Sequence, residues 1–538
     1  MPRSSRNTHD LGARTLALGL AASAAAVGAF LLLQRSAWPP HEDETLALFV
    51  GRSSLGELLE TVHGERGGAP LHFLLAWLVG HAGGGLTELR LLSTLFAVVS
   101  VPLVGLLAAR LAGRTAGLAT AVLVSGSWIL LFHGIYARMY SLFLATSALS
   151  YLALLYALRQ GGRRAWALWV LAVLVTVSTH PYGAIVLATQ VVFFLVRRER
   201  VREGLIATAA VAVLGIPFWY TDLVLAGRFD VGVGGGGAQL GSPLEVLDYL
   251  GEVAGDFTTG WLVLLPVVLA LAAIGAFRLA RAQPRSALLV AVVLALPTGA
   301  LALARLGDTT SPESRHLIFA LPFFTLLVAQ GALALPGRRT GRAAAVLAVA
   351  ALLVGEVAWA RHKTPPLFEG EPNARIQARS AASAWLAETS RSDDVLFGYE
   401  PLYLGAWERS RRLSRTIVPR ADASLALGVL RGAREPLGRG VWVFDASKRS
   451  NITPRSSIPV RLPSPRRDFE ARAFGPYLII RTKEPAETAQ RYLQQASQVM
   501  LVGKALLIGD ADVNFVTVRR AAYRLERASS RSLSSSSR

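Results

Sequence analysis

Cysteine is absent from the 538-residue chain, which excludes disulfide bonds, thiolate metal sites and a cysteine nucleophile. Charge is also scarce: 17% of the residues are charged, and acidic residues number 36 against 56 basic ones. In a soluble protein the resulting net charge of +20 would suggest a nucleic-acid partner. Here many of the arginines flank long apolar segments, where they report membrane topology, so we expect no nucleic-acid partner.

Hydrophobic residues make up 52% of the chain, and they arrive in long blocks of Leu, Ala, Val and Gly. Such blocks are typical of helices surrounded by lipid and by each other, and they predict an all-α polytopic membrane protein. The first block has no convincing cleavage site, so we expect a retained span and no cleavable signal peptide. Eleven spans are predicted, at about 14–33, 90–110, 116–134, 139–158, 165–180, 182–196, 204–220, 260–280, 286–305, 317–335 and 343–360.

The arginines fix the predicted topology. They gather at the N-terminus and in every second loop, which the positive-inside rule assigns to the cytoplasm. The N-terminus is therefore predicted inside and the C-terminus outside, in the plasma membrane of the cell. These arginines are Arg3, Arg6, Arg14, Arg110, Arg114, Arg159, Arg163, Arg164, Arg197, Arg198, Arg200, Arg202, Arg278, Arg281, Arg285, Arg338, Arg339 and Arg342.

This topology places the whole stretch 34–89 outside. Its apolar segment 69–80 is short and begins at a proline, so it is expected to be interfacial or re-entrant and not a span. Two short amphipathic helices are predicted in the same loop, at about 43–52 and 54–63. Further along, the long loop 221–258 is also predicted outside, and its glycine-rich part 231–238 is expected to be flexible.

Beyond residue 361 the apolar runs shorten, which predicts a small extracytoplasmic α/β domain at 361–528 after a membrane module at 1–360. The tail 529–538 is expected to be disordered. Strands are predicted at 395–398, 440–444, 477–481 and 514–518, and helices at about 376–389, 421–433 and 485–498.

The acidic run His41-Glu42-Asp43-Glu44 follows directly on the first span. Three carboxylates at this place are not expected in a core, and they do nothing to anchor a helix end to anionic headgroups. They suit chemistry, or cation binding, at a membrane surface. From the residues alone, a solvated loop is the competing interpretation, and Glu42 is expected to remain solvated.

Four stretches follow one another along the chain: Asp43-Glu44, Ala69-Pro70-Leu71-His72, Leu89-Arg90-Leu91-Leu92-Ser93 and Ala137-Arg138-Met139-Tyr140. In this order they resemble the GT-C glycosyltransferases of the family 39-like group. Thr179-His180-Pro181-Tyr182 and Ser314-Arg315-His316 before Leu321-Pro322 add to the likeness, which covers about residues 10–335. The group includes protein O-mannosyltransferases, aminoarabinose transferases and many bacterial relatives. Ala69 departs from its common Pro-Pro element, and the C-terminal third resembles no family.

The resemblance implies transfer of a sugar from a polyprenyl-phosphate-linked donor to a lipid, glycan or protein acceptor at the outer face of the membrane. It implies Asp43 as general base, with Glu44 in a supporting or cation-binding role. Arg138, with Tyr140 nearby, is the candidate for the leaving lipid phosphate, and Arg315 and His316 would complete that clamp. Weaker substrate-binding candidates are His72, Arg90, His180 and Tyr182.

Structural alternatives stand beside these roles. Arg138 could be an interfacial anchor, and Arg90 could cap its helix or pair with Glu88. The histidines His72, His133 and His180 are more often packed residues than ligands, and Tyr136 suits an interface-belt aromatic. No cofactor is certain; a divalent cation at Asp43 or Glu44 stays open, because two adjacent carboxylates specify little.

Three other functions remain open on the sequence. A polytopic transporter or lipid flippase is disfavoured because no internal repeat is evident and the charges gather at the outer ends of the helices. A non-catalytic envelope-assembly protein would tolerate loss of Asp43. A polysaccharide polymerase or ligase would use a longer lipid-linked glycan.

Overall fold

The structure is a computed structural model that describes residues 11–35, 40–228, 243–304, 313–334, 340–364, 373–410, 413–414, 416–420, 423–445, 468–505 and 518–527. The predicted flexible stretch 231–238, the predicted strand at 514–518 up to its last residue, and the tail lie outside these ranges. The chain forms two compact units. The first comprises Met1–Trp38, Val50–Ala226 and Gly235–Gly370, and the second comprises Pro39–Phe49, Gly227–Gly234 and Glu371–Arg538.

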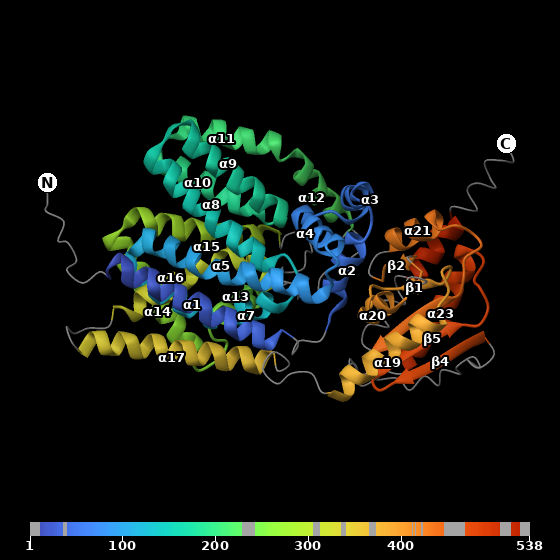
Figure 1. The fold of residues 1–538 in the computed structure, drawn as a ribbon. Helices are drawn as coiled ribbons and strands as arrows, with labels where there is room; N and C mark the ends of the chain where they lie inside the picture. Colours follow the sequence, from blue (N-terminus) through green and yellow to red (C-terminus); the bar gives the residue numbers. More distant parts are fainter. Residues whose placement is uncertain are drawn as a thin grey trace. The chain divides into compact units, whose positions relative to one another are not determined.

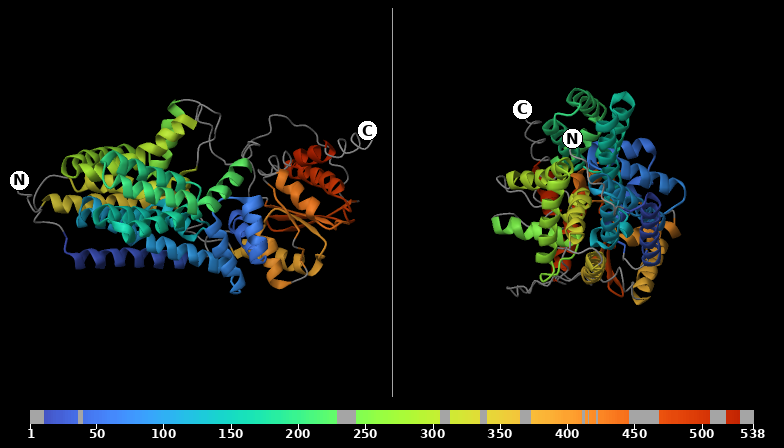
Figure 2. Two further views of the ribbon diagram at one scale, coloured as in Figure 1. Left: turned by 90° about the horizontal axis from the view of Figure 1, so that it is seen from above. Right: turned by 90° about the vertical axis from the view of Figure 1, so that its left-hand side faces the viewer.

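The described elements of the first unit are all helices, and its long helices run side by side in Figure 1 and in the left view of Figure 2. Its elements are α1 (Ala13–Gln34), α3 (Leu55–Thr61), η1 (Val62–Arg66), α4 (Pro70–His81), α5 (Leu86–Ala112), α6 (Arg114–Gly126), α7 (Trp128–Ile135), α8 (Tyr140–Gln160), α9 (Gly162–Thr179), α10 (Gly183–Arg197), α11 (Val201–Leu214), α12 (Ile216–Arg228), α13 (Pro243–Phe257), α14 (Leu265–Ala282), α15 (Pro284–Ala304), η4 (Ser314–Ala320), α16 (Leu321–Ala332) and α17 (Thr340–Lys363).

Each of the eleven predicted spans coincides with a helix or a pair of helices. Six are long and apolar enough to cross a membrane alone, and the bent pairs α6–α7 and α11–α12 raise the number to eight. Helices α9, α10 and α15 account for the other three predictions. The predicted all-α polytopic membrane protein is thus confirmed. That α9, α10 and α15 also span the membrane stays a prediction.

Helix α4 supports the prediction that segment 69–80 does not span. Its 12 residues are about 18 Å long at 1.5 Å per residue, well short of a hydrocarbon core of about 30 Å. Nearby, α3 begins with a capping box in which Ser54 and Glu57 exchange side-chain and backbone hydrogen bonds. The two helices predicted in this loop are present as α2 (Glu42–Gly51) and α3, but α2 is mostly buried and has no polar face, so its predicted amphipathic character is wrong.

Helices α14 and α16 approach each other closely at two glycines. A Cβ atom on Gly275 would lie 1.9 Å from the carbonyl oxygen of Leu327, and one on Gly331 would lie 2.0 Å from that of Leu271. Small residues let membrane helices pack backbone to backbone, where dispersion contacts replace the hydrophobic driving force that lipid removes. The two glycines therefore set the distance between these helices.

The second unit is built on a five-stranded sheet in the order β2-β1-β3-β5-β4. Strand β1 (Val395–Phe397) pairs in parallel with β2 (Ile417–Val418) and β3 (Gly440–Asp445), whereas β5 (Tyr477–Thr482) pairs antiparallel with β3 and β4 (Phe469–Phe474). The helices are α19 (Asn373–Thr389), α20 (Pro401–Arg409), α21 (Ala423–Gly432) and α23 (Ala489–Ala505). The predicted α/β domain is confirmed, with β2, β4 and α20 as additions.

Helices cover the sheet of the second unit. Alternate side chains of β3, Trp442 and Phe444, join a core formed with α21, α23 and residues 518–527, and Trp442 stacks on Tyr492 at 5.6 Å between ring centroids. Val441 and Val443, the alternate residues of β3, are buried on the opposite face. There the hydroxyl of Tyr403 donates to the carbonyl of Val441 at 3.1 Å. Both faces are therefore buried, which explains the continuous apolar run of β3.

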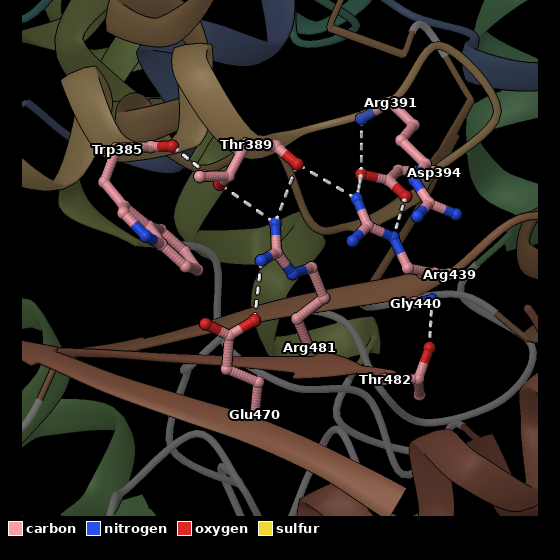
Figure 3. Close-up of polar contacts among 9 residues, drawn as sticks. All are labelled: Trp385, Thr389, Arg391, Asp394, Arg439, Gly440, Glu470, Arg481 and Thr482. Atoms are coloured by element: carbon pink, nitrogen blue, oxygen red, sulfur yellow. Dashed lines mark hydrogen bonds and ion pairs between the residues drawn. The ribbon is translucent and has the colours of Figure 1, made fainter. Parts of the chain in front are cut away.

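Two buried arginines close the C-terminal end of α19, as Figure 3 shows. Arg439 and Arg481 both donate to the carbonyl oxygen of Thr389 at 3.1 Å. The last carbonyls of a helix lack intrahelical partners and attract cations. Asp394 balances Arg439 through two bonds of 2.9 Å, and Glu470 balances Arg481 at 2.6 Å, so the buried charges are paired.

The acidic run forms the first turn of α2 and contributes to the second unit. Glu42 accepts the backbone N–H of Tyr399 at 2.8 Å and lies 3.5 Å from the guanidinium of Arg420. Thr45 donates its hydroxyl to the carbonyl of Tyr399. The expectation of a solvated Glu42 is therefore wrong, because its carboxylate joins residues far apart in the sequence.

Glu44 also departs from expectation. It is fully buried, whereas three carboxylates after a span were not expected in a core. Its Oε2 atom accepts the backbone N–H of His41 at 3.0 Å, and the ring of His41 accepts the backbone N–H of Asp43 at 3.2 Å. These bonds satisfy donors at the start of α2, where negative charge also suits the helix dipole.

We expect Gly331→Ala to lower the stability of the first unit by about 1–3 kcal/mol, because the new methyl group would overlap the backbone of α14. Gly299→Ala in α15 is the matched control, since nothing described lies within 4 Å of its Cβ position. Thermal unfolding of both variants in detergent measures the difference. Equal stabilities would contradict the close helix contact.

Candidate functional site

A non-helical turn joins α7 to α8 and carries Arg138. Side chains of α5 hold this turn, because Ser93 donates to the carbonyl of Arg138 at 3.4 Å and Thr94 donates to the carbonyl of Gly134 at 2.9 Å. The hydroxyl of Ser141 bonds the carbonyl of His133. Backbone groups freed at a helix break near a membrane need such partners. The stretches around Ser93 and Arg138 are thus in direct contact.

Tyr140, the first residue of α8, lies at the centre of a cluster of rings. The ring centroids of His133, His180 and His316 are 4.6, 5.7 and 5.9 Å from that of Tyr140. Tyr182 adds a second phenol, 5.5 Å from the ring of His316. These residues come from α7, α8, η4 and the turn between α9 and α10, and we call them the Tyr140 cluster.

Arg315 adds a positive charge to the Tyr140 cluster. Its guanidinium carbon lies 5.3 Å from the centre of the Tyr140 ring, and its Nη2 atom pairs with Glu313 at 2.6 Å. Arg315 and His316 stand in the 3₁₀ turn η4 that precedes α16. Pro322 at the start of α16 is compatible with this change of helix type, because proline is tolerated in the first turn of a helix.

Arg138 is the second arginine of the cluster. Its charge acts on His72, His180 and His316, and it also acts on Arg315. The charges of Arg138 and Arg315 therefore act on the same imidazole rings, those of His180 and His316. Because like charges repel, such an arrangement favours an anion between them, and the planar fork of arginine suits a phosphate.

His72 lies in α4 and is buried. Burial and the charge of Arg138 lower the pKa of His72 to about 3, so its ring is neutral at physiological pH. Ala69, the residue just before α4, has φ = 41° and ψ = 42°. Proline cannot adopt this left-handed conformation, because its ring fixes φ near −65°. The departure from the Pro-Pro element thus has a backbone reason.

Several buried polar atoms of this region lack a hydrogen-bond partner among the described residues. They include both ring nitrogens of His133, Nε2 of His72, Nε of Arg315 and the hydroxyl of Tyr249. Buried polar groups are nearly always bonded, and exceptions concentrate at sites that bind water, ions or ligands. The Tyr140 cluster therefore has hydrogen-bonding capacity in reserve for a polar ligand.

His180 and Arg90 have identifiable structural contacts. Nδ1 of His180 accepts the backbone N–H of Tyr182 at 3.1 Å, so its neutral ring carries the proton on Nε2. Arg90 donates to the carbonyl of Arg35 at 3.0 Å and thereby holds the end of α1. Glu88 instead bonds the backbone N–H of Gly85 at 2.7 Å in its own helix cap, so these bonds favour a structural role for Arg90.

The predicted site residues fall into two groups. Arg138, Tyr140, His180, Tyr182, Arg315 and His316 lie in the Tyr140 cluster, and the charge of Arg138 reaches His72. Asp43 and Glu44 lie on α2 in the second unit. Among the described residues, no group of three or more His, Asp or Glu side chains could hold a metal ion.

Helix α13 contributes a residue that the sequence analysis missed. Tyr249 is buried and interacts electrostatically with Tyr182. Its segment was predicted as part of a long loop and is instead the helix Pro243–Phe257. The buried or half-buried positions Val246, Leu250, Val253 and Phe257 follow a helical period, which is the signal that could have found it.

No family model and no curated protein matches the chain. Among solved structures, the chain is similar to the aminoarabinose transferase ArnT from Cupriavidus metallidurans, in the apo state (13% identity, TM-score 0.49) and bound to undecaprenyl phosphate (13%, 0.47). Both alignments cover 87% of this chain and 98% of that protein. The apo oligosaccharyltransferase from Archaeoglobus fulgidus is similar at 14% identity and a TM-score of 0.49, over 80% of this chain and 70% of that protein. Similarities at this level assign no function, so the functional argument rests on the residues.

Replacing Arg138 tests the anion site. We expect Arg138→Ala to weaken binding of a phosphate monoester by about tenfold or more, because a charge-assisted hydrogen bond is lost. Arg138→Lys should recover part of the affinity, since it keeps the charge without the planar fork. Binding of a labelled alkyl phosphate to the purified protein in detergent measures both.

Arg281→Ala is the control for charge removal. Arg281 lies exposed in the last turn of α14 and packs over the ring of Phe277 at 4.3 Å. Its loss should leave the affinity unchanged. Equal losses of affinity in the Arg138 and Arg281 variants would mean that binding depends on the net charge of the protein and not on this site.

Proposed function

We propose that the protein is a membrane glycosyltransferase that transfers a sugar from a polyprenyl-phosphate-linked donor to a lipid, glycan or protein acceptor. The observation that carries this proposal is the convergence of Arg138 and Arg315 on the Tyr140 cluster. The two cations suit the donor phosphate, and the neighbouring imidazole and phenol groups suit a sugar and its phosphate ester. Apolar helix surfaces around them suit a polyprenyl chain.

The proposed reaction is a displacement at the anomeric carbon. Asp43 takes the proton of the acceptor group as that group attacks the carbon, and the bond from the carbon to the phosphate oxygen breaks. The electron pair leaves with the polyprenyl phosphate, whose charge Arg138 and Arg315 stabilise. The role of Asp43 rests on its sequence motif, and Glu44, buried against the backbone of His41, is proposed to hold the segment.

The distribution of residues along the helices supports an outer location for the reaction. The cluster gathers at the start of α8 and η4 and at the end of α7 and α9. Arg159, Arg163 and Arg164 lie at the opposite end of the α8–α9 hairpin. By the positive-inside rule the arginine-rich end is cytoplasmic. We therefore propose that the cluster and the second unit are extracytoplasmic.

One buried residue favours the alternative of a transporter or flippase. Glu356 lies within the predicted last span, is fully buried, and its two carboxylate oxygens have no hydrogen-bond partner among the described residues. Ionisable residues inside a membrane often mark ion or proton pathways. Glu356 is four to five residues, about 7 Å along the helix, from the middle of the 24-residue helix α17, so it lies at the depth of the hydrocarbon core and is the residue that tests this alternative.

The catalytic proposal predicts that Asp43→Asn abolishes sugar transfer, by about 100-fold or more, because the general base is lost. Donor binding should remain, since the phosphate site does not depend on this carboxylate. The assay incubates purified protein with labelled polyprenyl-phosphate sugars and a membrane extract as the source of acceptor.

Glu57→Gln is the matched control, because it makes the same change in the same outer loop and glutamine keeps the capping box of α3. It should transfer sugar as the unmodified protein does. If the unmodified protein consumes no donor of the panel, and Asp43→Asn changes nothing in cells, the transferase proposal is wrong.

Glu356→Gln separates the transferase from the transporter. A transferase should keep its activity within about twofold, because the amide has the shape of the carboxyl group and takes no part in the reaction. Sugar transfer in detergent and lipid movement in vesicles would be measured on the same variant. Loss of lipid movement from a protein that transfers no sugar would favour the flippase.

A further inference from the structure

The ends of four helical elements meet at Asp256, which no sequence motif singled out. Asp256 stands at the end of α13 and is 2% exposed. Its Oδ2 atom accepts the hydroxyl of Ser314, the first residue of η4, at 2.5 Å. Its Oδ1 atom pairs with Lys363, the last residue of α17. A buried carboxylate with both oxygens engaged is strongly held in one orientation.

The fourth element joins through Lys363. Its ammonium nitrogen lies 4.1 Å from the ring centre of Trp128, the first residue of α7. The indole of Trp128 donates to the hydroxyl of Thr364. Lys363 thus links the carboxylate of Asp256 to the aromatic face of Trp128 through a cation–π contact.

These contacts hold the starts of η4 and α7, two elements that carry residues of the Tyr140 cluster. Ser314 precedes Arg315 and His316 in η4, and Trp128 begins the helix that carries His133 and leads to Arg138. The charge of Lys363 acts on His133, so the two groups are near each other. The orientation of both phosphate-binding arginines therefore depends on segments that Asp256 holds together.

We propose that Asp256 is a positioning residue for the donor-phosphate site, acting through Ser314 on Arg315 and His316 and through Lys363 on α7. This inference rests on the proposed function. A phosphate bound by two guanidinium groups requires both to be held within a fraction of an ångström of their binding geometry. Asp256 itself touches no reacting atom, because both of its oxygens are bonded to Ser314 and Lys363.

The experiment compares Ser314→Ala, Ser314→Thr and Asp256→Asn. Ser314→Ala removes the hydroxyl that Asp256 binds, and Ser314→Thr keeps one. We expect Ser314→Ala and Asp256→Asn to raise both the dissociation constant for undecaprenyl phosphate and the KM for the donor by about tenfold, since each loses a bond to a buried charge. The KM for the acceptor should stay unchanged, and Ser314→Thr should recover most of the affinity.

Two controls remove comparable contacts elsewhere in the first unit. Tyr151→Phe deletes the buried bond between Tyr151 and Thr189, of 2.7 Å, eleven residues or about 16 Å along α8 from Tyr140. Glu203→Gln weakens the carboxylate that binds Trp166 and Arg200 near the opposite end of α9. Both controls should keep the KM for the donor, even where thermal stability falls.

The outcomes separate the two proposals. If the unmodified protein binds undecaprenyl phosphate and folded Ser314→Ala and Asp256→Asn bind it equally well, the positioning role of Asp256 is wrong and the transferase proposal stands. If the unmodified protein neither binds undecaprenyl phosphate nor consumes a donor, both proposals are wrong. A tenfold loss that Ser314→Thr restores, with unchanged binding in both controls, supports the positioning role.

Discussion

Backbone hydrogen bonding at the break between α7 and α8 is the constraint on which the candidate site depends. Lipid offers no hydrogen bonds, so a chain that leaves the helix near the membrane must find partners within the protein. The hydroxyls of Ser93 and Thr94 on α5 and of Ser141 on α8 supply them. Because the break is fixed in this way, Arg138 and Tyr140 have defined positions and can act together with η4.

The same environment explains why charged and polar side chains gather at the ends of the helices. A charged side chain is costly inside lipid, so arginines, histidines and carboxylates concentrate where helices end. Such ends are also where unsatisfied backbone groups attract ions. Asp256 combines both effects, since it joins the end of α13 to the start of η4 and the end of α17 through one buried carboxylate.

The acidic run shows how structural and chemical roles share a segment. Glu42 and Glu44 bond backbone N–H groups of Tyr399 and His41, and all three carboxylates lie in the first turn of a helix, where negative charge is favourable. Function was the first interpretation of this run because the sequence cannot show that residues near 42 and near 399 meet. The contact between them is tertiary and gives Glu42 a structural role, whereas the structural role of Glu44 comes from its local bond to the backbone of His41.

The sequence by itself determined the membrane class, the places of the spans and the α/β character of the C-terminal part. Lipid and sheet packing impose patterns that apolar runs display directly, and for this reason α1, α5 and β3 lie where they were predicted. It also named Arg138, Tyr140, Arg315 and His316 as candidates through their motifs. Helix α13 and strand β4 were not predicted, because four acidic residues interrupt the apolar positions of α13 and because β4 has the charged sequence FEARAF. Only the tertiary structure decided that Tyr140 lies among three histidines, that Tyr249 and Asp256 belong beside them, and that Arg90 holds the end of α1. Those facts depend on which helix ends meet, and that is decided by packing between residues up to 176 positions apart, as for Tyr140 and His316.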